Sequence, residues 1–161
     1  MVIHMKPLMT VWLAVLVVLM SAGAGLAHHS LANHDTTKAV RVKGTIVQFH
    51  PINPHSFIYL EERAPDGQIR RWAIEGPSGL QLARRSLEKV VKPGDVIEVC
   101  GYAPKEALMW QIASADPGAV SLAGRLITAE LIVMRDGKVQ SWGDYGFHRC
   151  FPPDYRDGHS R

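Results

Sequence analysis

The sequence predicts a mainly β domain, a small five-stranded OB-like barrel with one helix between strands 3 and 4. Five segments bounded by turn residues have the apolar patterns of β-strands, and the second of them, His55–Glu62, is apolar on both faces at its centre. One segment of helical period lies between the third and the fourth, where an OB barrel carries its helix. The same order of elements also suits a two-layer α+β sandwich, so this alternative stays open.

The first predicted strand, Ala39–His50, is unusually long. Its apolar residues keep one face up to Gly44 and then change phase. A glycine with a phase change indicates a bend or bulge, as in a strand that serves two parts of a barrel. We expect one face to hold Val40, Val42 and Ile46, and the other, beyond the bend, to hold Val47 and Phe49.

Four further strands are predicted between turns rich in proline, glycine and aspartate. Asp66-Gly67 is a strong hairpin signal between the second and the third. In the fourth strand Ile97 and Val99 should face inward, which puts Cys100 on the outer face. The four strands are His55–Glu62, Gln68–Glu75, Val96–Tyr102 and Arg125–Met134, the last with Ile127, Ala129, Leu131 and Val133 inward.

The helix is predicted to begin at Ser78, because Ser78 and Gln81 have the spacing of a capping box. Apolar residues follow at helical spacing as far as Val90, and a Lys-Pro-Gly-Asp turn ends the helix. A long connector after the fourth strand holds a short expected helix, Glu106–Ala113. The aromatic, Pro- and Gly-rich tail carries no predicted structure.

The amino-terminal residues have the pattern of a cleavable secretory signal. Lys6 precedes the apolar run Leu8–Met20, which is shorter than the roughly 20 residues of a membrane span. We expect cleavage after Ala27, a periplasmic location and no permanent membrane anchor; cleavage after Ala24 and an uncleaved anchor are the alternatives. The predicted organisation is a signal peptide at 1–27, an N-terminal arm at 28–38, the OB-like domain at 39–135 and a tail at 136–161.

Charge and cysteine content narrow the function classes. A formal net charge of +3 is too small to indicate a nucleic-acid binder. The two cysteines, Cys100 and Cys150, are expected to form a structural disulfide in an oxidising compartment. We find no G-x-S-x-G motif and no reactive-cysteine context, and the carboxylates look like surface charges at strand ends, so the sequence does not predict an enzyme. Those carboxylates are Glu61, Glu62 and Glu75.

Histidines are concentrated near the amino terminus, where five of the eight lie between residues 28 and 55. Imidazole binds copper and zinc well, so a copper or zinc ion is the expected cofactor. After cleavage at Ala27, the free amine and Nδ1 of His28 would chelate one ion. We expect a site at either His50 with His55 across the turn, or His28 with His29. The alternative is a solvated arm and ordinary turn histidines.

A second hypothesis uses aromatic residues. Phe57 and Tyr59 share a face with His55, and Trp72 is expected nearby. OB barrels bind ligands on this part of the sheet, so the three aromatics are candidate ligand-binding residues, although such a stripe also suits a core. On this hypothesis the protein is a metal-free periplasmic accessory module that binds a protein or a glycan.

Four stretches carry a family resemblance when taken in order. They are His28-His29-Ser30, Lys43-Gly44-Thr45 leading to Asn53-Pro54-His55, Trp72 with Glu75, and Leu87 through Lys92-Pro93-Gly94-Asp95 to Gly101. Together they resemble a family of small exported bacterial proteins of unknown function, number 6152. The resemblance covers about His28 to Gly101 and implies a periplasmic location and no established activity. It does not extend to the longer connector and cysteine-bearing tail.

Overall fold

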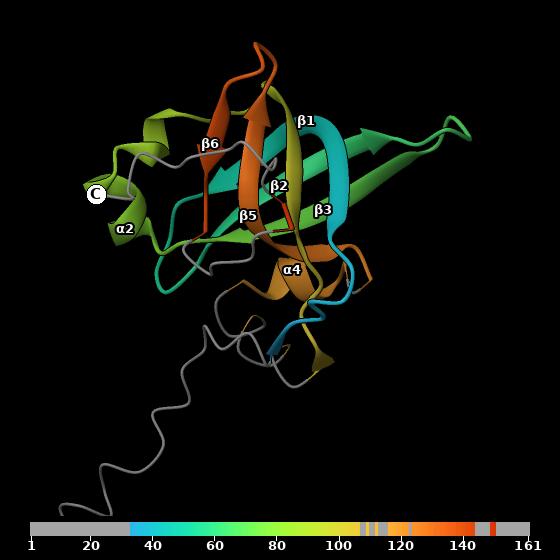
Figure 1. Cartoon of the computed structure of the whole chain (residues 1–161), viewed down its shortest axis with the longest axis horizontal. Coiled ribbons are helices and arrows are strands. Elements are labelled where there is room, and N and C mark those ends of the chain that lie inside the picture. The colour runs from blue at the N-terminus through green and yellow to red at the C-terminus, as the bar shows by residue number, and fades with distance from the viewer. Residues whose placement is uncertain are drawn as a thin grey trace, which may run out of the picture.

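The computed structural model describes residues 33–106, 109, 112, 116–122, 124–143 and 149–150 (Figure 1). Six strands wrap into a strongly coiled sheet, and α2 and α4 lie outside it. The strands are β1 (Val40–His50), β2 (Ser56–Arg63), β3 (Ile69–Gly76), β4 (Val96–Tyr102), β5 (Leu126–Met134) and β6 (Val139–Ser141). The helices are α2 (Gly79–Arg84), the 3-10 helix η2 (Leu87–Lys89) and α4 (Pro117–Val120).

The first five strands close into a barrel. The sheet order is β3-β2-β1-β4-β5-β6, and a parallel pairing of β3 with β5 joins the two sides. All other pairings are antiparallel. The predicted five-stranded OB-like barrel, with its helix after the third strand, is confirmed, and its closure excludes the two-layer sandwich.

Strand β1 is shared between two sides of the barrel, as predicted. Its first part pairs with β4 and its last part with β2, and Thr45 lies opposite both Val96 and Glu61. A Cβ atom on Gly44 would meet the backbone oxygen of Glu61 at 2.6 Å. Only glycine therefore permits this close approach of β1 to β2.

The change of phase in β1 comes later than predicted. The register shifts between Ile46 and Gln48, which makes Val47 the extra residue of a bulge. Val47 packs against apolar residues outside the barrel, whereas Phe49 packs against the interior. The prediction that Val47 and Phe49 share a face was wrong, because the bulge lies at Val47 and not at Gly44.

The helical segment begins as predicted and ends early. The Ser78 hydroxyl accepts from the backbone N–H of Gln81 at 3.2 Å, and the Gln81 side chain accepts from the backbone N–H of Ser78. This is the predicted capping box. Ser86 then takes a left-handed φ of 55°, which separates α2 from η2. The single helix expected as far as Val90 is therefore two short helices.

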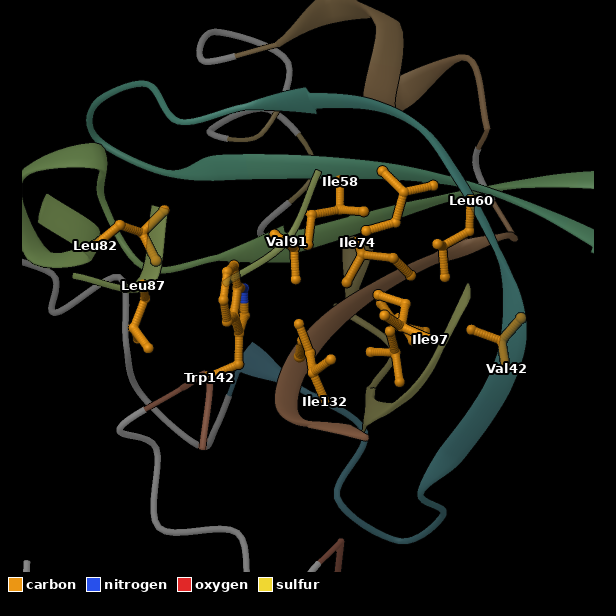
Figure 2. Close-up of a cluster of buried hydrophobic side chains, with 14 residues drawn as sticks. Val42, Ile58, Leu60, Ile74, Leu82, Leu87, Val91, Ile97, Ile132 and Trp142 are labelled. Atoms are coloured by element: carbon orange, nitrogen blue, oxygen red, sulfur yellow. The ribbon is translucent and has the colours of Figure 1, made fainter. Parts of the chain in front are cut away.

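The interior of the barrel is filled by apolar side chains from all five barrel strands. Leu82 of α2 and Leu87 of η2 close one end, and Trp142, just beyond β6, packs beside them (Figure 2). The Trp142 and Phe49 rings lie 6.3 Å apart between centroids. The buried cluster comprises Val42, Ile46, Ile58, Leu60, Ile74, Leu82, Leu87, Val91, Ile97, Val99, Ile127, Ala129, Ile132 and Trp142.

Strand β5 contains a second bulge. The register with β4 shifts at Glu130, which is an extra residue on β5. Ile127 and Ala129, which precede Glu130, face the interior as predicted. Beyond Glu130, the residue that faces the interior is Ile132. The prediction that Leu131 and Val133 face inward was wrong, because the bulge moves both of them to an outer cluster.

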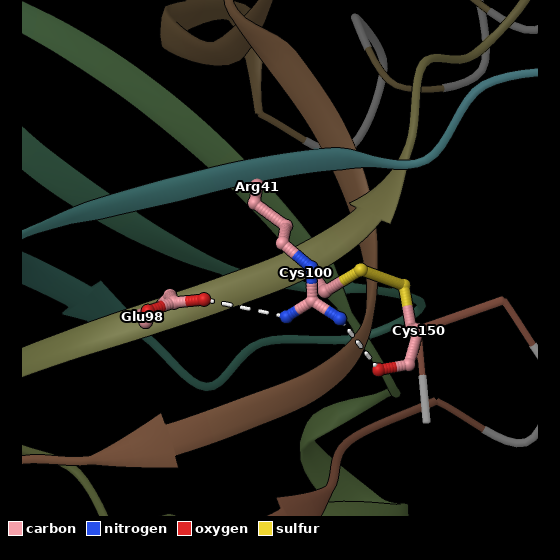
Figure 3. Close-up of a disulfide and its surroundings, with 4 residues drawn as sticks. All are labelled: Arg41, Glu98, Cys100 and Cys150. Atoms are coloured by element: carbon pink, nitrogen blue, oxygen red, sulfur yellow. Dashed lines mark hydrogen bonds and ion pairs between the residues drawn. A yellow bond between two sulfur atoms is a disulfide. The ribbon is translucent and has the colours of Figure 1, made fainter. Parts of the chain in front are cut away.

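The disulfide lies on this outer side. Cys100 and Cys150 are bonded, with their Cα atoms 5.6 Å apart, which confirms the predicted pair (Figure 3). Arg41 of β1 donates from Nη2 to the carbonyl oxygen of Cys150 at 2.9 Å, and its Nη1 lies 3.3 Å from Oε1 of Glu98. Cys150 is thereby held against the barrel wall.

The sheet continues beyond the predicted end of the barrel domain at residue 135. The tail begins with β6, which extends the sheet beyond β5. The expected helix Glu106–Ala113 and the predicted arm are only partly within the described residues, and the predicted signal lies outside them. In the part of the chain that the structure describes, no helix has the length and apolarity needed to cross a membrane.

Candidate functional site

A second apolar cluster covers the outer face of β2 and β3, and we call it the connector cluster. It forms because the segment between β4 and β5 returns across this face and buries it. Its members are Phe57, Tyr59, Ala73, Ile112, Ala119 and Leu126. The connector therefore covers the outer face of β2 and β3, and it also buries polar groups at the edge of this face.

The three candidate ligand-binding aromatics do not form one surface. Phe57 and Tyr59 are 0% and 5% exposed within the connector cluster. Trp72 packs against the barrel interior, and its Nε1–H donates to Oε2 of Glu62 at 2.7 Å. Phe57 and Tyr59 therefore follow the core alternative that the sequence left open, and Trp72 lies on the opposite side of the sheet.

His50 belongs to a polar group that holds the connector in place. Its Nδ1 lies 3.0 Å from Oδ2 of Asp116, which precedes α4. The carboxylate of Asp116 also accepts hydrogen bonds from the Tyr59 hydroxyl and, at 3.0 Å, from the backbone N–H of Gly118. The side chain of His50 is 42% exposed and that of Asp116 only 12%. Asp116 thus joins the end of β1 and the middle of β2 to α4.

Burial and these hydrogen bonds shift the pKa values of Asp116 and Tyr59. Desolvation raises the pKa of Asp116, but the hydrogen bonds from His50, Tyr59 and Gly118 outweigh it, so the pKa lies below 3.8. Burial, followed by the hydrogen bond to Asp116, raises the pKa of Tyr59 above its ordinary value of 10.0. Asp116 is therefore the charged member of the group and Tyr59 a neutral donor.

His55 belongs to a different group, which we call the buried polar network and which comprises His34, Thr128, Glu75 and His55. Nδ1 of His55 lies 3.1 Å from Oε1 of Glu75. The Thr128 hydroxyl donates to Oε2 of Glu75 at 2.6 Å, and Nε2 of His34 lies 3.0 Å from the same hydroxyl. All four residues are buried. The network joins the arm to the start of β2 through β5 and β3.

The barrel topology explains why these four residues meet. Glu75 and Thr128 are partners in the parallel β3–β5 pairing that closes the barrel. His55 directly precedes β2, whose antiparallel partner is β3. His34 forms a backbone bridge with Pro104, just beyond β4, which brings the arm to β5. The network therefore depends on barrel closure and not on any local sequence motif.

The structure regroups the predicted metal ligands. His50 lies opposite Phe57 in the β1–β2 register, so His50 and His55 are not the direct cross-strand neighbours that we expected. Each contacts its own carboxylate. His28 and His29 lie outside the described residues. Among the residues that the structure describes, no three His, Cys, Asp or Glu side chains are close enough to form a complete metal site.

Three residues of these groups had no predicted role in a site, namely Asp116, Thr128 and Glu75. Glu75 was expected at the surface, and it is only 2% exposed. Its position at the end of an alternating strand carries no sign of burial, because the burial comes from the distant connector and arm.

Residues 15–112 match the family described as "Family of unknown function (DUF6152)", which is more than half of the chain. The chain belongs to this family. The DUF6152 match covers β1 to β4 and reaches into the connector, so it includes His34, His55 and Glu75 but not Thr128. No curated protein matches the sequence.

Among solved structures, this DUF6152 protein is similar to the crystal structure of Rim1, a mitochondrial single-stranded DNA binding protein of S. cerevisiae. The TM-score is 0.42 at 14% sequence identity, over 61% of this chain and 93% of that chain. A likeness at this level carries no information about what the DUF6152 protein binds.

Proposed function

We propose that this protein is a small periplasmic binding protein whose ligand is a transition-metal ion, copper or zinc. The observation that carries the proposal is the contact of His55 with Glu75, which sets an imidazole nitrogen beside a carboxylate oxygen in a buried position. Imidazole and carboxylate are both ligands of such ions. Two protein ligands bind an ion weakly, so the proposal needs further ligands.

The predicted ligands His28 and His29 are the candidates for completing the site. Only six positions separate His28 from His34, and an extended chain of that length spans about 20 Å. Nε2 of His34 is 3.0 Å from the hydroxyl that also contacts Glu75. The anchored end of the arm, at His34, is thus beside Glu75, and the proposal assigns the further ligands to His28 and His29.

Export is the second part of the proposal. The disulfide supports it, because structural disulfides form and persist in oxidising compartments. Cleavage after Ala27 would make His28 the amino terminus and would add an amine ligand. Intact-mass measurement of the secreted protein tests this directly. A mature start at Gly25 would remove the amine ligand but not the imidazoles.

The decisive experiment is metal titration of protein secreted with its native amino terminus. We expect one equivalent of Cu²⁺ or Zn²⁺ to bind with micromolar or tighter affinity. His55→Ala and the double variant His28→Ala with His29→Ala should each weaken binding at least tenfold. His50→Ala is the matched control, because it removes an imidazole from a different group, and it should change affinity less than threefold.

Each outcome of this titration has a defined meaning. If the wild-type protein shows no measurable binding at micromolar metal, the metal proposal fails, and a metal-free accessory module that binds a protein or glycan replaces it. If His50→Ala abolishes binding while His55→Ala does not, the site lies beside Asp116 and the role proposed for His55 is refuted.

A further inference from the structure

We propose that the protein also binds a phosphate monoester with an apolar substituent, in a hollow between η2 and the turn that joins β5 to β6. This turn lies at the top of Figure 1. The hollow has a volume of about 530 Å³, within the roughly 300–1,000 Å³ typical of small-ligand sites. It shares no residue with the buried polar network, so this site goes beyond the proposed metal site. The lining residues are Lys89, Val90, Met134, Arg135, Asp136 and Lys138.

Both walls of the hollow are anchored to the barrel. Leu87 of η2 is 4% exposed in the barrel core, and its carbonyl oxygen accepts from the backbone N–H of Val90 at 3.0 Å. In the opposite wall, the backbone N–H of Met134 donates to the carbonyl oxygen of Lys138 at 2.8 Å. The carboxylate of Asp136 accepts from the backbone N–H of Lys138 at 3.0 Å. The backbone that carries the lining side chains is therefore held in place before any ligand binds.

The apolar lining residues lie deeper in the protein than the charged ones. Val90 and Met134 are half-buried and pack against the core of the barrel, whereas the four charged lining residues are exposed. A hydrocarbon group that contacts Val90 and Met134 leaves water, which is favourable. A bare inorganic anion makes no use of this apolar surface, so the ligand carries an apolar substituent.

The charged residues make the mouth of the hollow cationic. Within the described part of the chain, no ion pair involves Lys89, Arg135 or Lys138. Asp136 is the acidic residue among the described lining residues, and one of its carboxylate oxygens is bonded to the backbone of the turn. Three cations and one carboxylate leave two positive charges for a ligand to neutralise.

A phosphate monoester matches this charge. It carries about 1.5 to 2 negative charges at pH 7 on three oxygens that are strong hydrogen-bond acceptors. The planar guanidinium of Arg135 can donate to two of these oxygens in parallel, and the two lysines act as compact point charges. A monocarboxylate carries a single negative charge, so we expect it to bind more weakly.

Calorimetric titration with phenyl phosphate tests the site, using protein secreted with its native amino terminus in metal-free buffer. We expect a Kd below about 1 mM at low ionic strength, and weaker binding as added salt screens the exposed cations. Inorganic phosphate, which lacks the apolar group, and benzoate, which lacks the second charge, should each bind at least threefold more weakly.

Glutamine substitutions locate the binding, because they remove the charge and keep much of the aliphatic stem. Arg135→Gln, and Lys89→Gln combined with Lys138→Gln, should each weaken phenyl phosphate binding at least fivefold. Lys43→Gln is the matched control, because Lys43 is an exposed cation of β1 that lines a neighbouring hollow and not this one. It should change the affinity less than twofold. All four positions are exposed, and urea unfolding checks that each variant keeps wild-type stability.

Phosphate monoesters occur both as soluble molecules and as the headgroup of phosphatidic acid, and sedimentation with vesicles distinguishes the two. Binding to phosphatidylcholine vesicles only when they contain phosphatidic acid, lost in Arg135→Gln, supports the site with a lipid ligand. Phenyl phosphate binding without vesicle binding supports it with a soluble ligand.

Three results would overturn the proposal. The first is no binding of phenyl phosphate up to about 10 mM. The second is a loss in Lys43→Gln as large as in Arg135→Gln, which would show that binding follows the net charge of the protein. The third is benzoate that binds as tightly as phenyl phosphate, which would refute the phosphate assignment. None of these results bears on the metal proposal, because no substitution touches the buried polar network.

Discussion

Replacing Asp116 with asparagine tests whether one carboxylate anchors the connector to the barrel. The carboxylate accepts hydrogen bonds from His50, Tyr59 and the backbone N–H of Gly118. Asparagine keeps one oxygen, which serves Gly118, and places an amide group where Oδ2 accepts from His50. Hydrogen bonds to charged groups contribute about 1.5–3 kcal/mol each. Because His50 is 42% exposed, solvent reduces its share, and we expect Asp116→Asn to lower the free energy of unfolding by about 1–2 kcal/mol at neutral pH.

The pH dependence of that loss has a defined sign. The pKa of Asp116 is lower in the folded protein than its ordinary value of 3.8, so folding favours the ionised form. Its contribution to stability is complete above the unfolded-state pKa and disappears as the pH falls through the folded-state pKa. The difference between wild type and Asp116→Asn should therefore be constant from about pH 5 to 7 and should shrink below about pH 4.

Urea unfolding at several pH values measures this difference. Asp136→Asn is a suitable control, because Asp136 only accepts from the backbone N–H of Lys138 in a turn, which asparagine can also do. Tyr59→Phe combined with Asp116→Asn gives the coupling energy of the pair. The expected loss is about 1–2 kcal/mol. A loss below about 0.5 kcal/mol, or a loss that is the same at pH 3 as at pH 5, would refute the anchoring role.

Three further predictions concern the barrel. Replacing Cys100 and Cys150 with serine opens a loop of 50 residues, and in the chain-entropy model this lowers the free energy of unfolding by about 4 kcal/mol. Urea unfolding under oxidising conditions measures this loss, and a loss below about 1 kcal/mol would contradict the prediction. Leu82→Ala should cost about 2–5 kcal/mol, since this side chain closes one end of the barrel, and thermal unfolding measures it; a neutral result would show that α2 is not part of the core. Gly101→Ala should cost about 1–3 kcal/mol by the same assay, because its Cβ would clash with the backbone oxygen of Thr128; wild-type stability would disprove this contact.

The strands were predictable because their period is a local property of the sequence. Alternation and turn residues located all five barrel strands to within a few residues, and the capping pair Ser78 and Gln81 located the start of α2. The two bulges were not predictable in the same way. At Glu130, residues on both sides of the strand are apolar, because the tail and the disulfide cover the outer face. Where both faces are buried, alternation no longer identifies the inward side.

The candidate site was predictable only in part, for a related reason. Clustering of histidines identified His50 and His55 as residues of interest, but their carboxylate partners come from β3 and the connector. Glu75 is buried by segments far from it along the chain, and no pattern in the residues next to Glu75 indicates this burial. Strand order and barrel closure determine which carboxylate a turn histidine contacts. Both are properties of the whole fold, so no local sequence pattern predicts the contact.

Barrel closure also explains why two histidines five positions apart serve different groups. His50 ends β1 and faces the connector, where it contacts Asp116; His55 begins the next segment and contacts Glu75. Glu75 meets Thr128 only because β3 and β5 pair in parallel, and this pairing closes the barrel. An ion bound at His55 and Glu75 would therefore bind the closed barrel alone. Under the proposed function, such a ligand would stabilise the folded state by RT ln(1 + [L]/Kd), about 2.7 kcal/mol at 100 times Kd, which would link metal binding thermodynamically to barrel closure.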